Sequence, residues 1–276
     1  MTVRIQKSWS LFGGAGLVLL CTIPAVLAPW LWPYDPVLDA DLMVAEESPS
    51  LAYPFGTDDQ GRDVFVRVVH GGRVSLLIGI VTQLVNTVIG LILGVSAGYL
   101  GGRWDDAVSF LTNVMLAIPS LIFALAIMAI LGPGLGSLLI ALALTNWAYT
   151  CRIARSQAMS LRSREYVQAA RVLGYGDIRI MATQVLPNML GPIVVIGTLG
   201  MGSAILGEAA LSFLGLGVQP PQASWGSMLS DARDSLFFAP WASIFPGIAI
   251  FVCVLGLNLL GDGLRDRFDP RSVTRL

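Results

Sequence analysis

Long apolar runs recur along this chain, and they constrain its fold more than any other feature. The runs near Trp9–Trp32, Val74–Leu100 and Trp241–Leu260 are each long enough to cross the hydrocarbon core of a bilayer as a helix. Only 13% of the residues are charged, against about 25% in soluble domains. The sequence therefore predicts an all-α polytopic membrane protein.

Six transmembrane helices are predicted in all. The other three lie at about Ala107–Leu131, with a kink at Pro119, near Ser137–Cys151 and near Asn188–Leu211. An even number of crossings puts both termini on one side, where 13 of the 17 basic residues then fall. The four on the other side are Arg62, Arg67, Arg73 and Arg233. Because basic residues favour the cytoplasm, both termini and residues 162–187 are predicted to be cytoplasmic.

Three regions are predicted along the chain. Residues 1–73 hold the N-terminal transmembrane helix and an extracytoplasmic loop, and residues 74–261 form a core of five transmembrane helices. The core contains a cytoplasmic loop at 162–187, between spans four and five, and an outer loop at 212–240 that is too polar to span freely. Residues 262–276 are predicted to be a charged cytoplasmic tail.

Scarce residue types exclude several kinds of chemistry. Lys7 is the only lysine, so the chain holds no Walker A loop and cannot hydrolyse ATP by the P-loop route. His70 is the only histidine, which excludes His-rich metal sites and indicates a loop or interfacial side chain. Cys21, Cys151 and Cys253 lie in or beside apolar segments, which favours buried thiols over a disulfide framework. The chain is predicted to be non-catalytic, with no cofactor or metal of its own.

The segment 162–187 is too compact for a domain and too structured for a plain link. A short helix is predicted on each side of Gly174, because glycine can take the left-handed conformation that ends a helix. Asp177 can cap the second helix, and Pro187 suits the first turn of the apolar helix that follows. One face of the first helix holds Tyr166, Ala169, Ala170 and Leu173, at i, i+3, i+4 and i+7 spacing. This pattern indicates a contact surface for a partner in the water phase; the alternative is an ordinary helical hairpin anchored by its arginines.

Family motifs cover nearly the whole chain. The pattern Q-A-A-x3-G-x9-Q-x-L-P, from Gln168 to Pro187, resembles the "EAA" loop of ABC-importer permeases, E-A-A-x3-G-x9-I-x-L-P. The stretch F-G-T-D-D-Q-G-R-D-V-F-V-R-V-V-H-G-G-R-V-S-L, at Phe55–Leu76, closely resembles the segment before the second span in C-type subunits of the dipeptide/oligopeptide/nickel branch. Further motifs of that branch occur in order at Ala97–Asp105, Ser212–Pro221, Trp225–Leu229 and Asn258–Pro270.

In that family the loop forms a coupling helix that docks into a groove on a cytoplasmic ATPase. The resemblance implies this docking role for Glu165, Gln168, Ala169, Ala170, Gly174, Asp177, Leu186 and Pro187. Gln168 stands where the family has glutamate and Gln184 where it has isoleucine, so this chain lacks the charge at the first position. The implied partners are a homologous permease in a heterodimer, two ATPases that bind ATP and magnesium, an extracytoplasmic solute-binding protein and membrane lipid.

Charged residues gather in the outer loop before the second predicted span. Asp58, Arg62 and Asp63, with Trp225 from the later outer loop, are expected to face the binding protein. A helix starting at Asp63 would place Arg67 at i+4, where the two can pair on an exposed surface. A metal or acid/base site is the alternative for these carboxylates, and a structural or docking role is favoured.

Polar residues within the predicted spans are few. Glu208 is the one ionisable residue of the fifth span, where charge is costly. It can accept a hydrogen bond from a substrate amino group in the pathway, or lie solvated or paired beyond the hydrocarbon edge. Asn258 is a second pathway candidate, although a helix-packing hydrogen bond is favoured for it. Gly90, Gly94 and Gly98 form a stripe that predicts close helix packing.

The resemblance implies a membrane-spanning permease subunit of an ATP-driven ABC importer in the bacterial inner membrane. It would form half of a translocation pathway for di- or oligopeptides that the binding protein delivers. A nickel-complex or glutathione importer of the same family is the alternative, since substrate selection lies largely in the binding protein. An ion-coupled secondary transporter is disfavoured, because the sequence shows no internal repeat and one intramembrane carboxylate. A membrane enzyme would need a catalytic constellation that is absent from the sequence, and no nucleic-acid partner is expected.

Overall fold

The structure is a computed structural model that describes residues 2–35 and 38–268, with side chains from residue 9 onward. The predicted all-α class is confirmed. Among the described residues, the only β-type pairing outside helices is an isolated bridge between Thr57 and Asp63. The long helices are α1 (Thr2–Leu31), α2 (Val64–Leu100), α3 (Gly102–Ala117), α4 (Ser120–Leu131), α5 (Leu135–Arg162), α8 (Leu190–Phe213) and α10 (Trp241–Phe268). The short ones are η1 (Leu42–Val44), α6 (Glu165–Val172), α7 (Asp177–Ile180), η2 (Met181–Val185), η3 (Pro187–Met189) and α9 (Trp225–Asp231).

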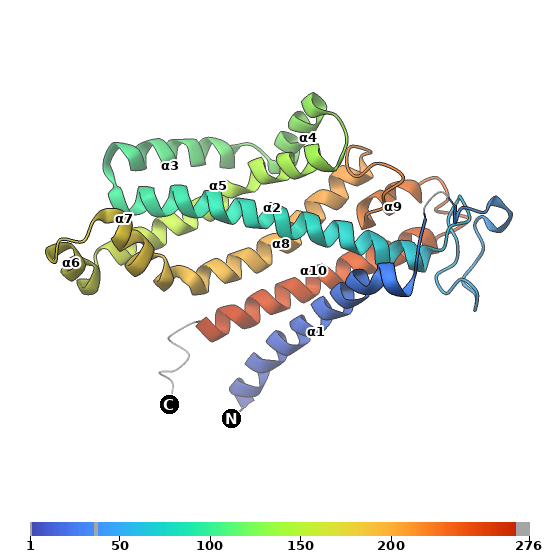
Figure 1. Cartoon of the computed structure of the whole chain (residues 1–276), viewed down its shortest axis with the longest axis horizontal. Helices are drawn as coiled ribbons and strands as arrows, with labels where there is room; N and C mark the ends of the chain where they lie inside the picture. Colours follow the sequence, from blue (N-terminus) through green and yellow to red (C-terminus); the bar gives the residue numbers. More distant parts are fainter. Residues whose placement is uncertain (1, 36–37, 269–276) are drawn as a thin grey trace.

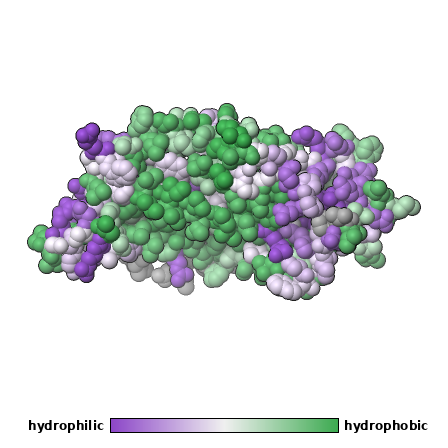
Figure 2. Space-filling model, turned by 45° about the horizontal axis from the view of Figure 1, so that its top comes forward, coloured by the Kyte–Doolittle hydropathy of each residue, from purple (hydrophilic) through white to green (hydrophobic). Residues whose placement is uncertain are grey.

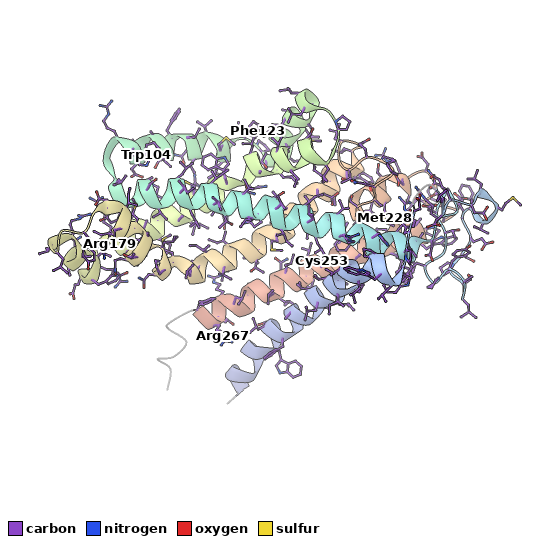
Figure 3. The ribbon with its side chains drawn as sticks, in the orientation of Figure 1. Trp104, Phe123, Arg179, Met228, Cys253 and Arg267 are labelled. Atoms are coloured by element: carbon purple, nitrogen blue, oxygen red, sulfur yellow. The ribbon has the colours of Figure 1, made fainter. Side chains whose placement is uncertain are left out.

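The long helices run back and forth and pack side by side as a bundle (Figure 1). The start of α1 and the end of α10 lie toward the end of the bundle that carries α6 and α7. The opposite end carries α9 and the loop between α1 and α2. These are called the α6–α7 end and the α9 end below, and Figure 3 marks them with Arg179 and Met228 respectively.

Apolar residues cover the middle of the bundle. On the face drawn in Figure 2, a broad hydrophobic belt lies between hydrophilic surfaces at the two ends. Four helical stretches are long and apolar enough to cross a membrane, namely Trp9–Leu31, Val64–Leu100, Asp177–Phe213 and Trp241–Phe268. The bent pair of α3 and α4 makes a fifth candidate. The described residues therefore hold four or five candidate spans, and the remaining predicted crossing falls on α5.

α5 is less apolar than these spans, and it packs closely against α2. A Cβ added at Gly90 would lie 2.6 Å from Thr150 Cβ, and one at Gly94 would lie 2.5 Å from the carbonyl oxygen of Cys151. These distances leave no room for a side chain, so the predicted close packing is confirmed. Because neighbouring helices cover α5, its Thr145 and Thr150 are buried against protein.

The third predicted span is broken rather than kinked. α3 and α4 meet at 88° around Pro119. Ile118 has extended backbone, with φ −90° and ψ 126°, because the ring of the following proline disfavours the helical region. The sequence placed the bend at the correct residue and underestimated its angle.

Two predicted boundaries move. α2 begins at Val64, so the division between residues 73 and 74 falls inside a helix. α1 packs against α10, where a Cβ at Gly14 would overlap the backbone of Leu260, so the N-terminal helix belongs to the same packed body as the core. α10 continues to Phe268, inside the predicted tail, and residues 269–276 lie outside the described part.

Candidate functional site

The corner between α3 and α4 lines a cavity of about 520 Å³, halfway along α2. Ile118, Pro119 and Ser120 form one wall and Gln83 of α2 another, and the remaining walls come from α3, α5 and α8. At membrane depth, backbone outside a helix is tolerated only where protein covers it or where it lines a cavity. The α3–α4 corner is tolerated because it lines a cavity.

The polar side chains of this central cavity are all uncharged. They are Gln83, Ser120, Thr145, Asn146, Tyr149, Thr150 and Ser203. Gln83 is 6% exposed, and its Nε2 donates to Thr87 Oγ1 at 3.1 Å, which leaves its carbonyl oxygen free to accept. Amides and hydroxyls can bind an amide-containing ligand without selecting for charge. Sequence reasoning missed this site, because its residues are scattered over several helices and form no motif.

Glu208 lies elsewhere, in a buried group of hydroxyls between α2, α8 and α9. Its Oε1 accepts hydrogen bonds from Ser224 Oγ at 2.6 Å and from Ser212 Oγ at 2.7 Å. Its Oε2 accepts one from Ser75 Oγ at 3.1 Å, and the residue is 0% exposed. Three hydroxyl donors offset much of the cost of burying a carboxyl group.

The sequence allowed a pathway role or a solvated or paired group for Glu208, and the structure shows a carboxyl group hydrogen-bonded within the chain. The residue does not line the central cavity, and no solvent reaches it. Its contacts instead hold the start of α9, because Ser224 caps that helix and the Trp225 N–H donates to Ser75 Oγ at 3.1 Å. Asn258, the other pathway candidate, is exposed on α10 and also lies outside the cavity.

Two arginines and three aspartates, Asp58, Asp59 and Asp231, form a cluster at the α9 end. Asp58, Arg62 and Arg67 are each at most 6% exposed. Arg62 Nε donates to Asp58 Oδ2 at 2.8 Å, and Arg67 pairs with the same carboxylate. Arg67 Nη2 also donates to Asp231 Oδ2 of α9 at 2.9 Å. The cluster therefore joins the loop before α2, the start of α2 and the end of α9.

These contacts correct the expectations for the outer loop. Asp63 caps α2 by accepting hydrogen bonds from two N–H groups of its first turn, and it does not pair with Arg67. Partial burial raises the pKa of the Asp63 carboxyl, and the two backbone hydrogen bonds oppose that rise. Asp58, Arg62 and Trp225, which were expected to face a binding protein, are buried within this chain.

The segment 162–187 folds as α6 and α7 around Gly174, and it is called the α6–α7 segment below. Gly174 has φ +80°, the predicted left-handed conformation. Gly176 precedes the first turn of α7, and Asp177 lies inside that turn, so the predicted cap is wrong. From α7 the chain continues through the π-helical turn η2 and the turn η3 into α8. Pro187 is the first residue of η3 and lies inside the helical stretch Asp177–Phe213, rather than at the start of a separate helix as predicted.

One side of the α6–α7 segment packs into the bundle. Val167, Ala170 and Ile180 are buried in one apolar cluster with Tyr99 of α2 and with residues of α5. Arg171 Nη2 donates to the Tyr99 hydroxyl at 3.1 Å. The inner side of α6 is therefore packed directly on α2 and α5.

The other side of the segment exposes apolar side chains. Tyr166 is 40% exposed, Leu173 73%, Ile178 81% and Val172 88%. Of the predicted face, Ala170 points inward, whereas Tyr166 and Leu173 point outward. A row of exposed apolar side chains on so short a segment indicates a protein-contact surface.

Gln168 uses its side-chain amide within the segment. Its Nε2 donates to the carbonyl oxygen of Arg162, at the end of α5, at 2.8 Å. An ionised glutamate could not make this bond, because a carboxylate has no hydrogen to donate. Gln184 lies in η2 and is half-buried, and its backbone carbonyl accepts from Asn188 Nδ2 at 2.6 Å. The other expected docking residues are exposed (Glu165, Ala169, Gly174, Asp177 and Pro187) or half-buried (Leu186).

The three cysteines are free thiols, with Cys151 and Cys253 buried and Cys21 half-buried. Cys21 of α1 and Cys253 of α10 share one apolar cluster, which agrees with the prediction of buried thiols. Within residues 2–35 and 38–268, no group of three or more His, Cys, Asp or Glu side chains is arranged to hold a metal ion.

Residues 90–274 match the family of binding-protein-dependent transport system inner membrane components. The chain is 44% identical over 264 residues to the di/tripeptide transport system permease protein DppC of Pseudomonas aeruginosa, a match that covers 94% of this chain and 87% of the relative. It is 49% identical over 226 residues to the dipeptide transport system permease protein DppC of Alkalihalophilus pseudofirmus, covering 82% of this chain and 74% of that relative. The family match includes the α6–α7 segment and most walls of the central cavity.

Proposed function

The chain belongs to the family of binding-protein-dependent transport system inner membrane components, and we propose that it forms half of the translocation pathway of a peptide importer. Members of this family are non-catalytic permease subunits of the inner membrane, and separate ATPase chains bind the ATP. That arrangement agrees with the single lysine, Lys7, which leaves no Walker A loop in this chain. A homologous permease chain would supply the other half of the pathway.

The observation that carries the proposal is the two-sided α6–α7 segment. Val167, Ala170 and Ile180 fix its inner side to α2 and α5, while Leu173 and Ile178 are exposed on its outer side. An ATPase that binds the outer side can therefore displace the whole segment as a rigid body. Closure of the ATPase pair on ATP would then bias the bundle between inward-open and outward-open states. No bond is made or broken on this chain.

The central cavity is proposed as this chain's wall of the pathway. Its uncharged amides and hydroxyls suit the peptide main chain, which all di- and oligopeptides share. A charged wall would instead select among peptides by the charge of their side chains. The two relatives are named for the transport of dipeptides and of di/tripeptides, the substrate class that such a cavity suits.

The proposed orientation places the α6–α7 end in the cytoplasm and the α9 end outside, with six crossings. Support comes from the excess of basic residues toward the first end, and from the start of α1 and the end of α10, which both lie toward it (Figure 1). α5 supplies the sixth crossing. Its sequence is less apolar than that of the other spans, because α2 packs against it. The solute-binding protein would dock at the α9 end on exposed side chains such as Met43, Leu51 and Phe237.

The coupling claim is tested by Leu173→Glu in the complete importer, with both permeases, the ATPases and the binding protein. We expect retention of the ATPases and ATP-driven dipeptide uptake each to fall by about tenfold or more, because a charge enters an apolar contact. Ser160→Glu adds the same charge at the end of α5, outside the apolar row, and should leave both unchanged. Normal retention and uptake in Leu173→Glu would contradict the proposal.

Competition separates the proposed substrate class from a nickel complex or glutathione. Unlabelled dipeptides with acidic, basic and apolar side chains should each reduce uptake of a labelled dipeptide, whereas a nickel chelate and glutathione should not. Uptake should also require ATP and survive collapse of the proton gradient. Uptake that follows the gradient instead would favour an ion-coupled transporter.

A further inference from the structure

A groove of about 840 Å³ lies between α1 and α2, on the outside of the bundle. Val74, Leu77, Ile80 and Val81 of α2 line one of its sides, and Val26 of α1 lines the other. Several of these side chains are exposed, with Val26 at 55%, Ile80 at 50% and Leu77 at 48%. From Val74 to Val81 the apolar side extends over about 12 Å of helix.

The ionisable side chains of the groove lie at one end. Trp30, at the end of α1, and His70 and Arg73, near the start of α2, border it at the α9 end. Trp30 is 74% exposed, and exposed tryptophans of this kind lie at the level of lipid headgroups. His70, which lies in α2 rather than in a loop, donates from Nε2 to the Trp32 carbonyl at 2.8 Å and so joins the two helices. The polar end therefore faces the membrane surface, and the apolar end points toward the bilayer centre.

Arg73 is the cation of this polar end, and it has no counter-ion in the described chain. It is exposed and forms no ion pair with any residue of 2–35 or 38–268. Arg62 and Arg67, in contrast, are both paired with aspartates. A fixed cation beside the apolar side of the groove suits the phosphate of a lipid headgroup.

We propose that this groove binds one anionic phospholipid, with its phosphate on Arg73 and an acyl chain along Leu77, Ile80 and Val81. The proposal rests on the proposed insertion of the bundle across the membrane, which places the site in the leaflet on the α9 side. A phospholipid matches the groove in its single charged end, its apolar remainder and the direction from one to the other. By holding α1 against α2 at their outer ends, the lipid would stabilise the junction that His70 and Trp32 form.

A helix of the partner permease is the competing occupant. Such a helix would cover the apolar side chains, but it would have to bring a carboxylate to Arg73 at membrane depth, which is costly. A phospholipid brings the counter-ion at no such cost, because its phosphate already lies at the membrane surface.

The test uses the complete importer, purified in detergent and examined by native mass spectrometry. Phosphatidylglycerol or phosphatidylcholine with the same acyl chains is added in separate titrations. We expect one retained phosphatidylglycerol per complex, with a preference of about fivefold over phosphatidylcholine, the factor that one basic residue contributes near an anionic headgroup. Arg73→Gln should remove that preference, whereas Arg233→Gln, an exposed arginine of the same end that lies over the Phe213 ring, should keep it.

A second variant tests the groove apart from the charge. Leu77→Trp fills the apolar part and should reduce retention of both lipids, while ATP-driven uptake separately reports that the complex is assembled. The proposal is overturned if wild-type importer shows no preference for phosphatidylglycerol, or if Arg73→Gln keeps it. It is also overturned if Leu77→Cys forms a disulfide with a cysteine introduced into the partner permease in membranes. Lipid retention is independent of transport, so failure here would leave the proposed importer function untouched.

Discussion

A buried charged cluster at one end of the bundle contrasts with an exposed apolar row at the other. At the α9 end, charged side chains are buried, and Asp58, Arg62 and Arg67 find their partners within the chain. At the α6–α7 end, apolar side chains such as Leu173 and Ile178 are exposed and find none. The charged cluster is therefore satisfied within this chain, whereas the apolar row would be covered only by a partner protein. Damage at the α9 end should therefore reduce stability, and damage at the α6–α7 end should reduce coupling.

The largest loss of stability is expected from Arg67→Ala. Breaking a buried ion pair by removing one partner costs about 3–5 kcal/mol, because Asp58 remains buried with less compensation. Arg233→Ala removes an exposed arginine from the same end and should cost at most about 1 kcal/mol, the contribution of its contact with the Phe213 ring. The free energy of unfolding of the purified permease pair measures both. A cost below about 1 kcal/mol for Arg67→Ala would show that the α9 end does not depend on this cluster.

Glu208→Ala should give the second-largest loss of stability, about 2–3 kcal/mol in the free energy of unfolding, because it leaves three buried hydroxyls without their acceptor. Glu208→Gln keeps one acceptor oxygen and should cost less. Glu165→Gln, on the exposed start of α6, is the matched control and should leave stability unchanged. Thermal unfolding and dipeptide uptake are measured together. If uptake were lost at unchanged stability, Glu208 would have a role in the pathway, and the contrast between the two ends would be weaker.

Gly174→Val places a β-branched residue at φ +80° and should cost about 1–2 kcal/mol locally. We expect ATPase retention and uptake to fall, while the melting temperature of the bundle changes little. Gly176→Val is the matched control, because Gly176 has extended backbone, with φ −66° and ψ 151°, that valine accepts. Equal uptake in the two variants would mean that the turn at Gly174 is not needed for coupling.

The smallest effect is expected from Gln168→Glu, which restores the residue typical of the family. The carboxylate cannot donate to the Arg162 carbonyl, so the start of α6 should lose about 1 kcal/mol of local stability. Faster amide hydrogen exchange in α6 would report this loss. Gln184→Glu serves as control, because the Gln184 side chain makes only a 3.5 Å contact with Thr183. Unchanged exchange in α6 would remove the role given to the Gln168 amide.

The same contrast separates what the sequence could predict from what it could not. The α6–α7 segment depends on neighbours in sequence, so the turn at Gly174 was predictable from local backbone preferences. The stripe at Gly90, Gly94 and Gly98 was predictable for a similar reason, since its spacing alone indicates one helix face. Each of these features depends on the residues of a single stretch of chain.

The α9 end was not predictable in this way. Arg67 and Asp231 are 164 positions apart, and Ser75 and Glu208 are 133 positions apart. Which carboxylate meets which donor depends on how α2, α8 and α9 pack, and no local pattern records that choice. Local spacing gave Arg67 the wrong partner, Asp63, because a pair at i, i+4 was the only one visible in the sequence. The central cavity could not be predicted either, because its lining residues come from several helices.

The central claim is that motion of the α6–α7 segment reaches the central cavity. A single cysteine at Asn146→Cys, with Cys21, Cys151 and Cys253 replaced by alanine, reports access to that cavity through its rate of labelling by a membrane-impermeant maleimide. In the complete importer, trapping the ATPases in their ATP-bound state should change the labelling rate from each side of the membrane in opposite directions. Adding Leu173→Glu should abolish the change. Labelling that ignores nucleotide, or that still responds to it in the Leu173→Glu background, would contradict the account.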